Sequence, residues 1–156
     1  FAYFILSSNS LIVAYSLINL GVEITNDSLE IPIDVTLSYC QNSNIVSTGS
    51  IFITGKGQFT SKIKAFDTIE FTQEKAVARG GVLNARKCIK LKTVGSDAGV
   101  FTTLEVEKDG IITADIAYNN TVFCFGNKKK TLEVSGRNVK AFMDKDGEII
   151  IEKFVL

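Results

Sequence analysis

The chain has 156 residues and a mass of 17.0 kDa, about the size of one domain. Its residues are 46% hydrophobic and 22% charged, which indicates a core-forming chain and excludes an intrinsically disordered one. Basic and acidic residues both number 17, and no basic run exceeds three lysines, a poor electrostatic match for nucleic-acid phosphates. Histidine is absent, which removes the commonest general base and metal ligand. We therefore predict a single domain, residues 1–156, that is not an enzyme, binds no nucleic acid and carries no cofactor or metal.

The charges are distributed unevenly along the chain. Lys56 is the first basic residue, so residues 1–55 carry a net charge of −4 and residues 56–156 carry +4. Residues 1–22 have no charged side chain. We expect protein partners or self-association to cover this apolar N-terminal end. The start at Phe1 instead of Met predicts a fragment or a short form of a larger protein.

Residues 1–20, FAYFILSSNSLIVAYSLINL, raise the question of a membrane segment. A spanning helix needs about 20 apolar residues, but the polar stretch Ser7-Ser8-Asn9-Ser10 interrupts the run. A signal peptide would begin with a basic region and end at a small-residue cleavage site, and this segment fits that pattern poorly. The short β-branched and aromatic runs on either side of the polar stretch predict strands and no membrane span.

Three cysteines, Cys40, Cys88 and Cys124, are widely spaced and form no CxxC pattern. An odd number leaves at least one thiol unpaired, so the set does not resemble a disulfide framework. Small buried thiols in a reducing compartment fit better, and we predict a cytoplasmic protein.

Short segments of alternating hydrophobicity dominate the rest of the chain. This period of two is typical of strands, and no segment shows the 3.6-residue period of a long helix. In chain order, the predicted strands include residues 29–35, 51–54, 69–72, 89–92, 132–135 and 148–151.

The first apolar residues of these and related segments recur at an average spacing of about 20 residues, which is typical of a solenoid. We therefore predict an all-β, right-handed parallel β-helix of about eight coils, with an antiparallel β-sandwich as the alternative fold. Stacked coils would place Glu70 beside Lys90 on the outer surface. The eight positions taken as equivalent are Leu11, Leu29, Ile51, Ile69, Ile89, Ile111, Leu132 and Ile149.

Four polar motifs contain residue types that functional sites use. Arg79-Gly80-Gly81 lacks the context of a phosphate loop and predicts a tight turn at a coil corner. Residues 95–99, GSDAG, predict a loop, because a nucleophile there would have no base. Residues 144–148, DKDGE, predict a hairpin turn, because Val155 stands where a calcium loop needs its last carboxylate. Lys128, Lys129 and Lys130 follow Gly-Asn, predict a solvated turn, and are our candidate partner contacts.

The chain resembles a known family over residues 45–107 and 109–127. The segments that carry the similarity are Gly49-Ser50-Ile51-Phe52-Ile53, Ser61-Lys62-Ile63-Lys64-Ala65, ARGGVLNARKCIKLKTVGSDAGVFTTLEV at 78–106, and DGIITADIAYNNTVFCFGN. They are similar to the β-helical region of the flagellar assembly protein A (FapA) family. This resemblance implies a cytoplasmic scaffold or regulatory protein linked to flagellar assembly, and it implies no catalytic residues.

Three functions remain open at this point. The first is a non-enzymatic scaffold or interaction module in flagellar or cell-pole assembly. The second is a bactofilin-like, polymer-forming cytoskeletal protein. The third is a carbohydrate-active β-helix, which would need at least two outward carboxylates beside aromatic side chains.

Overall fold

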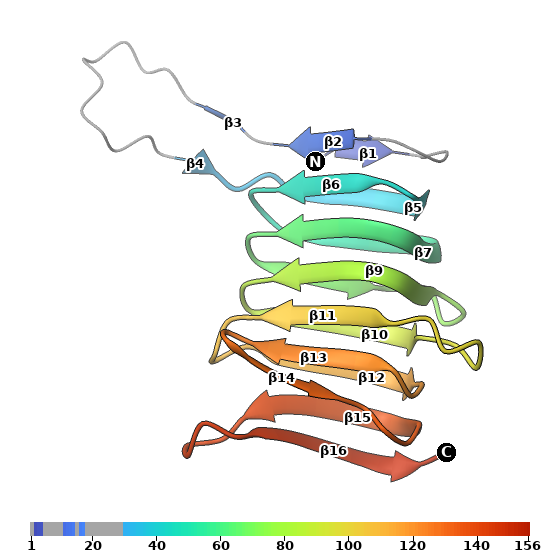
Figure 1. The fold of residues 1–156 in the computed structure, drawn as a ribbon. Helices are drawn as coiled ribbons and strands as arrows, with labels where there is room; N and C mark the ends of the chain where they lie inside the picture. The colour runs from blue at the N-terminus through green and yellow to red at the C-terminus, as the bar shows by residue number, and fades with distance from the viewer. Residues whose placement is uncertain (1, 5–10, 15, 18–29) are drawn as a thin grey trace.

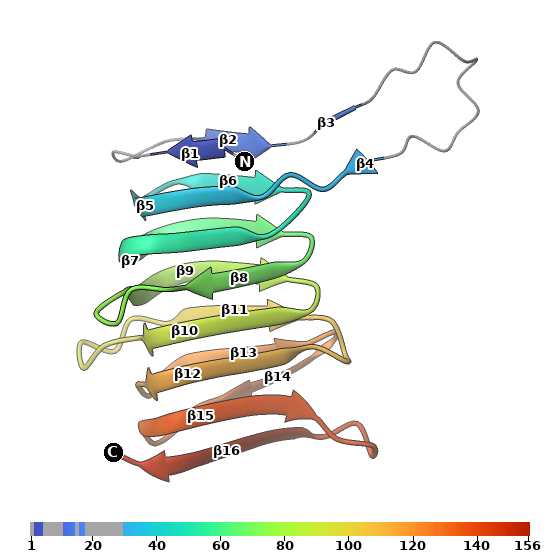
Figure 2. The same cartoon turned by 180° about the vertical axis from the view of Figure 1, so that it is seen from behind.

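The computed structural model describes residues 2–4, 11–14, 16–17 and 30–156, and in this part of the chain it contains strands and no helix. The chain winds into a β-solenoid of about five turns (Figures 1 and 2). The strands are β1 (Ala2–Phe4), β2 (Leu11–Ala14), β3 (Ser16–Leu17), β4 (Glu30–Ile31), β5 (Val35–Gln41), β6 (Asn44–Ser47), β7 (Ile51–Ala65), β8 (Thr68–Phe71), β9 (Val77–Ala85), β10 (Cys88–Val94), β11 (Thr102–Val106), β12 (Ile111–Ala117), β13 (Thr121–Phe125), β14 (Lys128–Thr131), β15 (Gly136–Met143) and β16 (Ile149–Val155).

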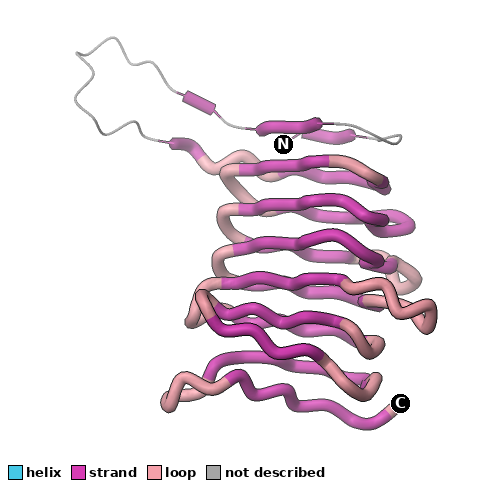
Figure 3. The backbone as a smooth tube through the Cα atoms, viewed as in Figure 1, coloured by secondary structure: helices cyan, strands magenta, loops and turns pink. Residues whose placement is uncertain are grey.

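Each coil crosses two stacked layers of strands. One layer contains β1, β5, the first half of β7, β8, β10 and β12, and the other contains β2, β6, the second half of β7, β9, β11 and β13. Neighbours within both series pair in parallel, so the antiparallel sandwich is not the fold. Figure 3 shows the two layers as successive rungs joined by short loops.

The prediction of eight coils was wrong. Ile51, Ile69 and Ile89 are direct partners in neighbouring coils, but Ile111 lies opposite Cys88, one residue out of register. Beyond β12 and β13 the chain turns back: β14, β15 and β16 all pair antiparallel, so Leu132 and Ile149 begin no new coil. Both strand directions have a side-chain period of two, and the alternation used to count coils could not separate them. Leu29 lies outside the described residues, and Leu11 belongs to the opposite layer from Ile51.

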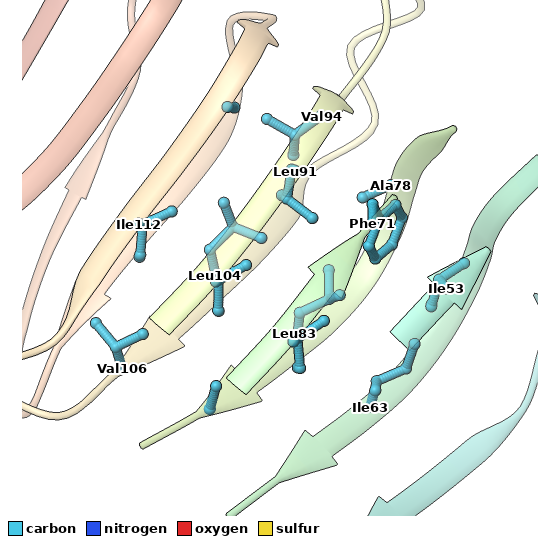
Figure 4. Close-up of a cluster of buried hydrophobic side chains, with 14 of the residues drawn as sticks. Ile53, Ile63, Phe71, Ala78, Leu83, Leu91, Val94, Leu104, Val106 and Ile112 are labelled. Carbon is cyan, nitrogen blue, oxygen red and sulfur yellow. The ribbon is translucent and has the colours of Figure 1, made fainter. Parts of the chain in front are cut away.

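Columns of apolar side chains fill the space between the layers (Figure 4). In one layer the buried side chains become smaller along the axis, from Phe71 to Leu91 to Ala114. Leu91 is the register partner of Ala114, and Phe71 and Leu91 each follow directly on the register pair Glu70–Lys90. In the facing layer the buried side chains become larger over the same coils. This series ends at Phe123 and Phe125, which are both fully buried. The two trends compensate, which keeps the interior close-packed without an isolated large or small rung. A fully buried column of the second layer consists of Ile45, Ile63, Leu83, Leu104 and Phe123.

A second set of columns lies at the corner between the layers. Asn42, Thr60, Gly80 and Asn120 have positive φ angles of 48°, 50°, 70° and 65°, which turn the chain sharply. In three coils the next residue is a buried serine or threonine: Ser43, Ser61 and Thr121, and Thr102 occupies the same position in a fourth. The Gly80 amide donates to Thr102 Oγ1 at 2.8 Å, and the Ser43 amide donates to Ser61 Oγ at 3.2 Å. These bonds satisfy backbone groups that the corner removes from the strand ladders.

The predicted contact between neighbouring coils on the outer surface is confirmed. Lys90 and Glu70 are register partners, with Lys90 Nζ 3.8 Å from Glu70 Oε2. Both side chains are substantially exposed, so the pair contributes only a fraction of a kcal/mol. Its effect is on strand register more than on stability.

The described parts of the apolar N-terminal segment are strands, as the sequence predicts. β1 and β2 pair in parallel with β5 and β6, and so belong to the first coil. In the described residues, no helix is long and apolar enough to cross a membrane. The polar stretch at residues 7–10 lies outside the described residues.

Candidate functional site

A groove runs along the solenoid axis where β7, β9, β11 and β13 end. The arrowheads of β7, β9 and β11 stack at one side of the molecule in Figure 1. The groove has a volume of about 530 Å³. Ala65, Ala85 and Val106, the last residues of three successive strands, are buried at its base.

One wall of the groove is a column of outward-facing side chains in strand register. Lys64 lies opposite Asn84, Asn84 opposite Glu105, Glu105 opposite Cys124, and Cys124 opposite Lys129. We call these five residues the charge column. Asn84 Nδ2 donates to Glu105 Oε2 at 2.8 Å, which fixes the carboxylate in the middle of the column.

The other wall lies two residues further along each coil and is largely paired within itself. The Arg86 guanidinium carbon lies 4.6 Å from the ring centre of Phe66, and Arg86 Nε lies 3.7 Å from Glu107 Oε1. Lys128 Nζ lies 2.7 Å from Glu148 Oε1, on the turn between β15 and β16. This wall therefore presents charges that already have partners.

The charge column, in contrast, carries charges with few partners. Among the described residues, no ion pair involves Lys64, Glu105 or Lys129. Lys64 Nζ lies 5.5 Å from the Phe66 ring centre, and Glu105 accepts one hydrogen bond from a neutral amide. The column thus presents a positive, a negative and a positive charge, with one neutral residue between successive charges.

The three cysteines have free thiols, but of the buried thiols that we predicted only Cys40 is buried, and Cys88 and Cys124 are half-buried. Burial raises the pKa of the Cys40 thiol to about 11, against a smaller opposing effect of a hydrogen bond with Ser61. The pKa of Cys124, in the groove, is also raised, first by burial and then by the Glu105 carboxylate, while Lys129 lowers it. Burial likewise raises the pKa of Cys88. Thiols with raised pKa values are poor nucleophiles at neutral pH, so the groove has no activated cysteine.

The structure separates the three lysines that we predicted as partner contacts. They form the exposed strand β14 instead of a turn, because residues 128–131 pair antiparallel with β13. Lys128 and Lys129 line the groove. Lys130 Nζ instead donates to the carbonyl of Ile149 at 3.1 Å, which ties β14 to β16.

The other motifs form turns. Gly80 and Gly81, with φ angles of 70° and 78°, lie at the coil corner as predicted. Residues 144–148 form the hairpin turn between β15 and β16, where Asp144 Oδ1 accepts the amides of Asp146 and Glu148. Residues 95–99 lie in the loop between β10 and β11. No group of three or more possible metal-binding side chains occurs in the described part of the chain.

The sequence carries a signal of the groove that our predictions did not use. Lys64, Asn84, Glu105 and Cys124 each stand one residue before the small or apolar residue that ends a strand, at spacings of 20, 21 and 19 residues. The apolar positions that predict the coils lie mostly in the opposite layer, so their spacing does not reveal the alignment of these four residues.

The fold is that of a β-solenoid protein with a surface groove. No family model, curated protein or solved structure matches the chain.

Proposed function

We propose that this chain is a non-enzymatic scaffold or interaction module that contacts a protein partner through the groove. The observation that carries the proposal is that both walls of the groove are built across several coils. Within each wall, successive side chains come from successive coils. Such a site exists only when the coils are stacked, and the stacked strands hold its side chains at fixed spacing. The resemblance to the FapA family supports a role in flagellar or cell-pole assembly, in the cytoplasm, with a right-handed coil.

Photo-crosslinking from inside and outside the groove tests this function. Asn127, in the groove, and Lys62, which is exposed on β7 outside it, would each be replaced by benzoylphenylalanine in the source cells. We expect a discrete crosslinked protein from position 127 and none from position 62. The crosslink should disappear with Lys64→Glu and persist with a second-site change at Glu70→Gln, on the opposite layer. Crosslinks from both positions alike, or from neither, would reject the groove as the contact surface.

A carbohydrate-active protein is the second candidate, because two carboxylates and an aromatic ring line the groove. Glu105 and Glu107 both line it, together with Phe66. The first carboxylate is bonded to Asn84, the second lies beside Arg86, and the guanidinium of Arg86 covers one face of the ring. These contacts leave less of the groove free for a sugar, which favours the first proposal. Release of reducing ends from a polysaccharide panel by the wild type, but not by Glu105→Gln, would favour the second.

A bactofilin-like polymer is the other alternative. Head-to-tail growth adds a parallel coil to each end, whereas here β15 and β16 run antiparallel at the C-terminal end. Their direction favours an interaction module over a polymer subunit. Filaments that survive dilution in negative-stain microscopy would favour the polymer.

A further inference from the structure

The charge column has a regular spacing that a partner could match. Neighbouring strands in a sheet lie about 4.8 Å apart, so each step of the column covers about that distance. Lys64, Glu105 and Lys129 occupy its first, third and fifth positions. Successive charges are therefore about 10 Å apart, with alternating sign.

An extended peptide has a spacing that fits this pattern. In the extended polyproline II conformation a chain rises about 3.1 Å per residue with three residues per turn, so residues three apart lie about 9 Å apart and face the same side. A peptide lying along the groove would match the column with an acidic residue, a basic residue three positions later, and a second acidic residue three positions after that. The base of Ala65, Ala85 and Val106 has no charge that would oppose such a chain.

The alternating charges of the column favour a peptide over other extended ligands. A nucleic acid or a uronic-acid polysaccharide has charges of one sign, so Glu105 would repel its middle. A polypeptide can place both signs at chosen positions along one chain. Because this inference names the partner of the groove, it depends on the proposed function.

We propose that the groove binds an extended peptide segment of a partner protein with the charge pattern acidic-x-x-basic-x-x-acidic. Lys64 and Lys129 contact its two acidic residues, and Glu105 contacts the basic residue between them. Complementary charges at such a solvent-accessible surface contribute more to selectivity and association rate than to affinity. The binding is accordingly weak and sensitive to salt.

Three labelled, end-blocked heptapeptides test the pattern by fluorescence anisotropy. The matched probe is Asp-Ser-Thr-Lys-Ser-Thr-Asp, the inverse probe is Lys-Ser-Thr-Asp-Ser-Thr-Lys, and the control Asp-Asp-Lys-Ser-Thr-Ser-Thr has the matched composition in another order. We expect the matched probe to bind about tenfold more tightly than either of the others at low salt, and this preference to shrink as salt screens the charges. Lys62→Glu, on the same face of β7 but outside the groove, should leave the preference unchanged.

Inverting the column gives the decisive result. In the triple variant Lys64→Glu, Glu105→Lys and Lys129→Glu, the inverse probe should become the tighter ligand. If circular dichroism shows that this variant is unfolded, Lys64→Gln and Lys129→Gln should each weaken the matched probe at least threefold. Equal binding of all probes, an unchanged preference in a folded inverted variant, or no binding by the wild type would overturn the proposal. A groove-specific crosslink alongside any of these outcomes would leave the proposed function standing and reject only the charge pattern.

Discussion

Gly81 shows how closely successive coils approach at the corner. It has a φ of 78°, and a Cβ atom placed on it would lie 2.1 Å from the carbonyl oxygen of Ser61 in the previous coil. That oxygen belongs to the backbone and cannot move aside without disturbing the pairing of Ser61 with Gly81. Glycine is therefore required here for two reasons, the backbone conformation and the space available.

We expect Gly81→Ala to lower the free energy of unfolding by about 3 kcal/mol or more, because strain and a backbone clash add. Gly147→Ala is the matched control. Its φ is 77°, but the nearest atom to an added Cβ is the flexible Lys128 Nζ at 3.9 Å. This control should cost about 1 kcal/mol. Urea unfolding measures both, and equal losses would show that the close approach to Ser61 has no effect.

The buried Cys40 thiol makes the free energy of unfolding decrease at alkaline pH. Its pKa is raised from 9.0 to about 11 in the folded chain, so the unfolded chain loses this proton first as pH rises. The stabilisation from a neutral, buried thiol is complete below pH 9 and is lost between pH 9 and about pH 11. Two pKa units correspond to about 3 kcal/mol at most.

We expect the wild type to lose more stability than Cys40→Ala between pH 8 and pH 10.5. Chemical unfolding at a series of pH values measures the two slopes. Cys88→Ala is the control and should keep a slope closer to that of the wild type, because its thiol is only half-buried. Identical slopes for the wild type and Cys40→Ala would contradict the expectation.

At the scale of the strand, the corner hydrogen bonds hold one coil to the next. Gln58 is fully buried; its Nε2 donates to the Gly80 carbonyl at 2.8 Å, and its Oε1 accepts the Ser61 amide at 3.1 Å. Thr102, which lies in the coil after Gly80, accepts a hydrogen bond from the Gly80 amide. Three successive coils are thus joined through side chains at the point where the main-chain ladder is interrupted.

We expect Thr102→Val to lower stability by about 1 to 3 kcal/mol, because it leaves the buried Gly80 amide without its acceptor while keeping the side-chain shape. Thr103→Val is the matched control, since this neighbour on β11 is half-exposed and makes no such bond at the corner. Its effect should stay within about 0.5 kcal/mol. Thermal unfolding of the two variants side by side gives the comparison, and a loss shared by both would point to β11 itself instead of the corner.

The last strands differ from the coils in exposure and charge. β14 has four exposed residues, three of them lysines, and it ends one layer. Charged residues on a terminal strand discourage pairing with other chains. The bond from Lys130 to Ile149 and the ion pair from Lys128 to Glu148 attach this strand to the closing hairpin.

At the scale of the whole molecule, stability should behave as a sum over coils and their interfaces. Ser61 and Gly81 are register partners, so deleting residues 61–80 removes one whole coil. Each remaining strand then has a neighbour whose inward-facing and outward-facing residues match its own. Deleting residues 61–75 instead joins the chain out of register. The first deletion tests whether the repeat is the true structural unit.

We expect the chain without residues 61–80 to fold, with the strand signal in circular dichroism retained and a lower unfolding temperature. The chain without residues 61–75 should fail to fold, because a shift within the coil carries apolar side chains to the outer face. Because the first deletion also removes Lys64, it should lose the matched heptapeptide. Similar behaviour of both deletions would argue against independent coils.

The sequence by itself determined the all-β class, the spacing of about 20 residues and the contact of Glu70 with Lys90. These follow from local alternation and turn residues, which persist whatever the chain packs against. Only the tertiary structure decided where the coils stop, because Gly126-Asn127 and Asp144–Gly147 reverse the chain, while parallel and antiparallel strands have the same side-chain period. It also decided the groove, since Lys64, Glu105 and Lys129 become neighbours only through the register of four successive strand pairs. Register depends on packing between coils, and an error of one residue, as at Ile111, moves a side chain to the opposite face.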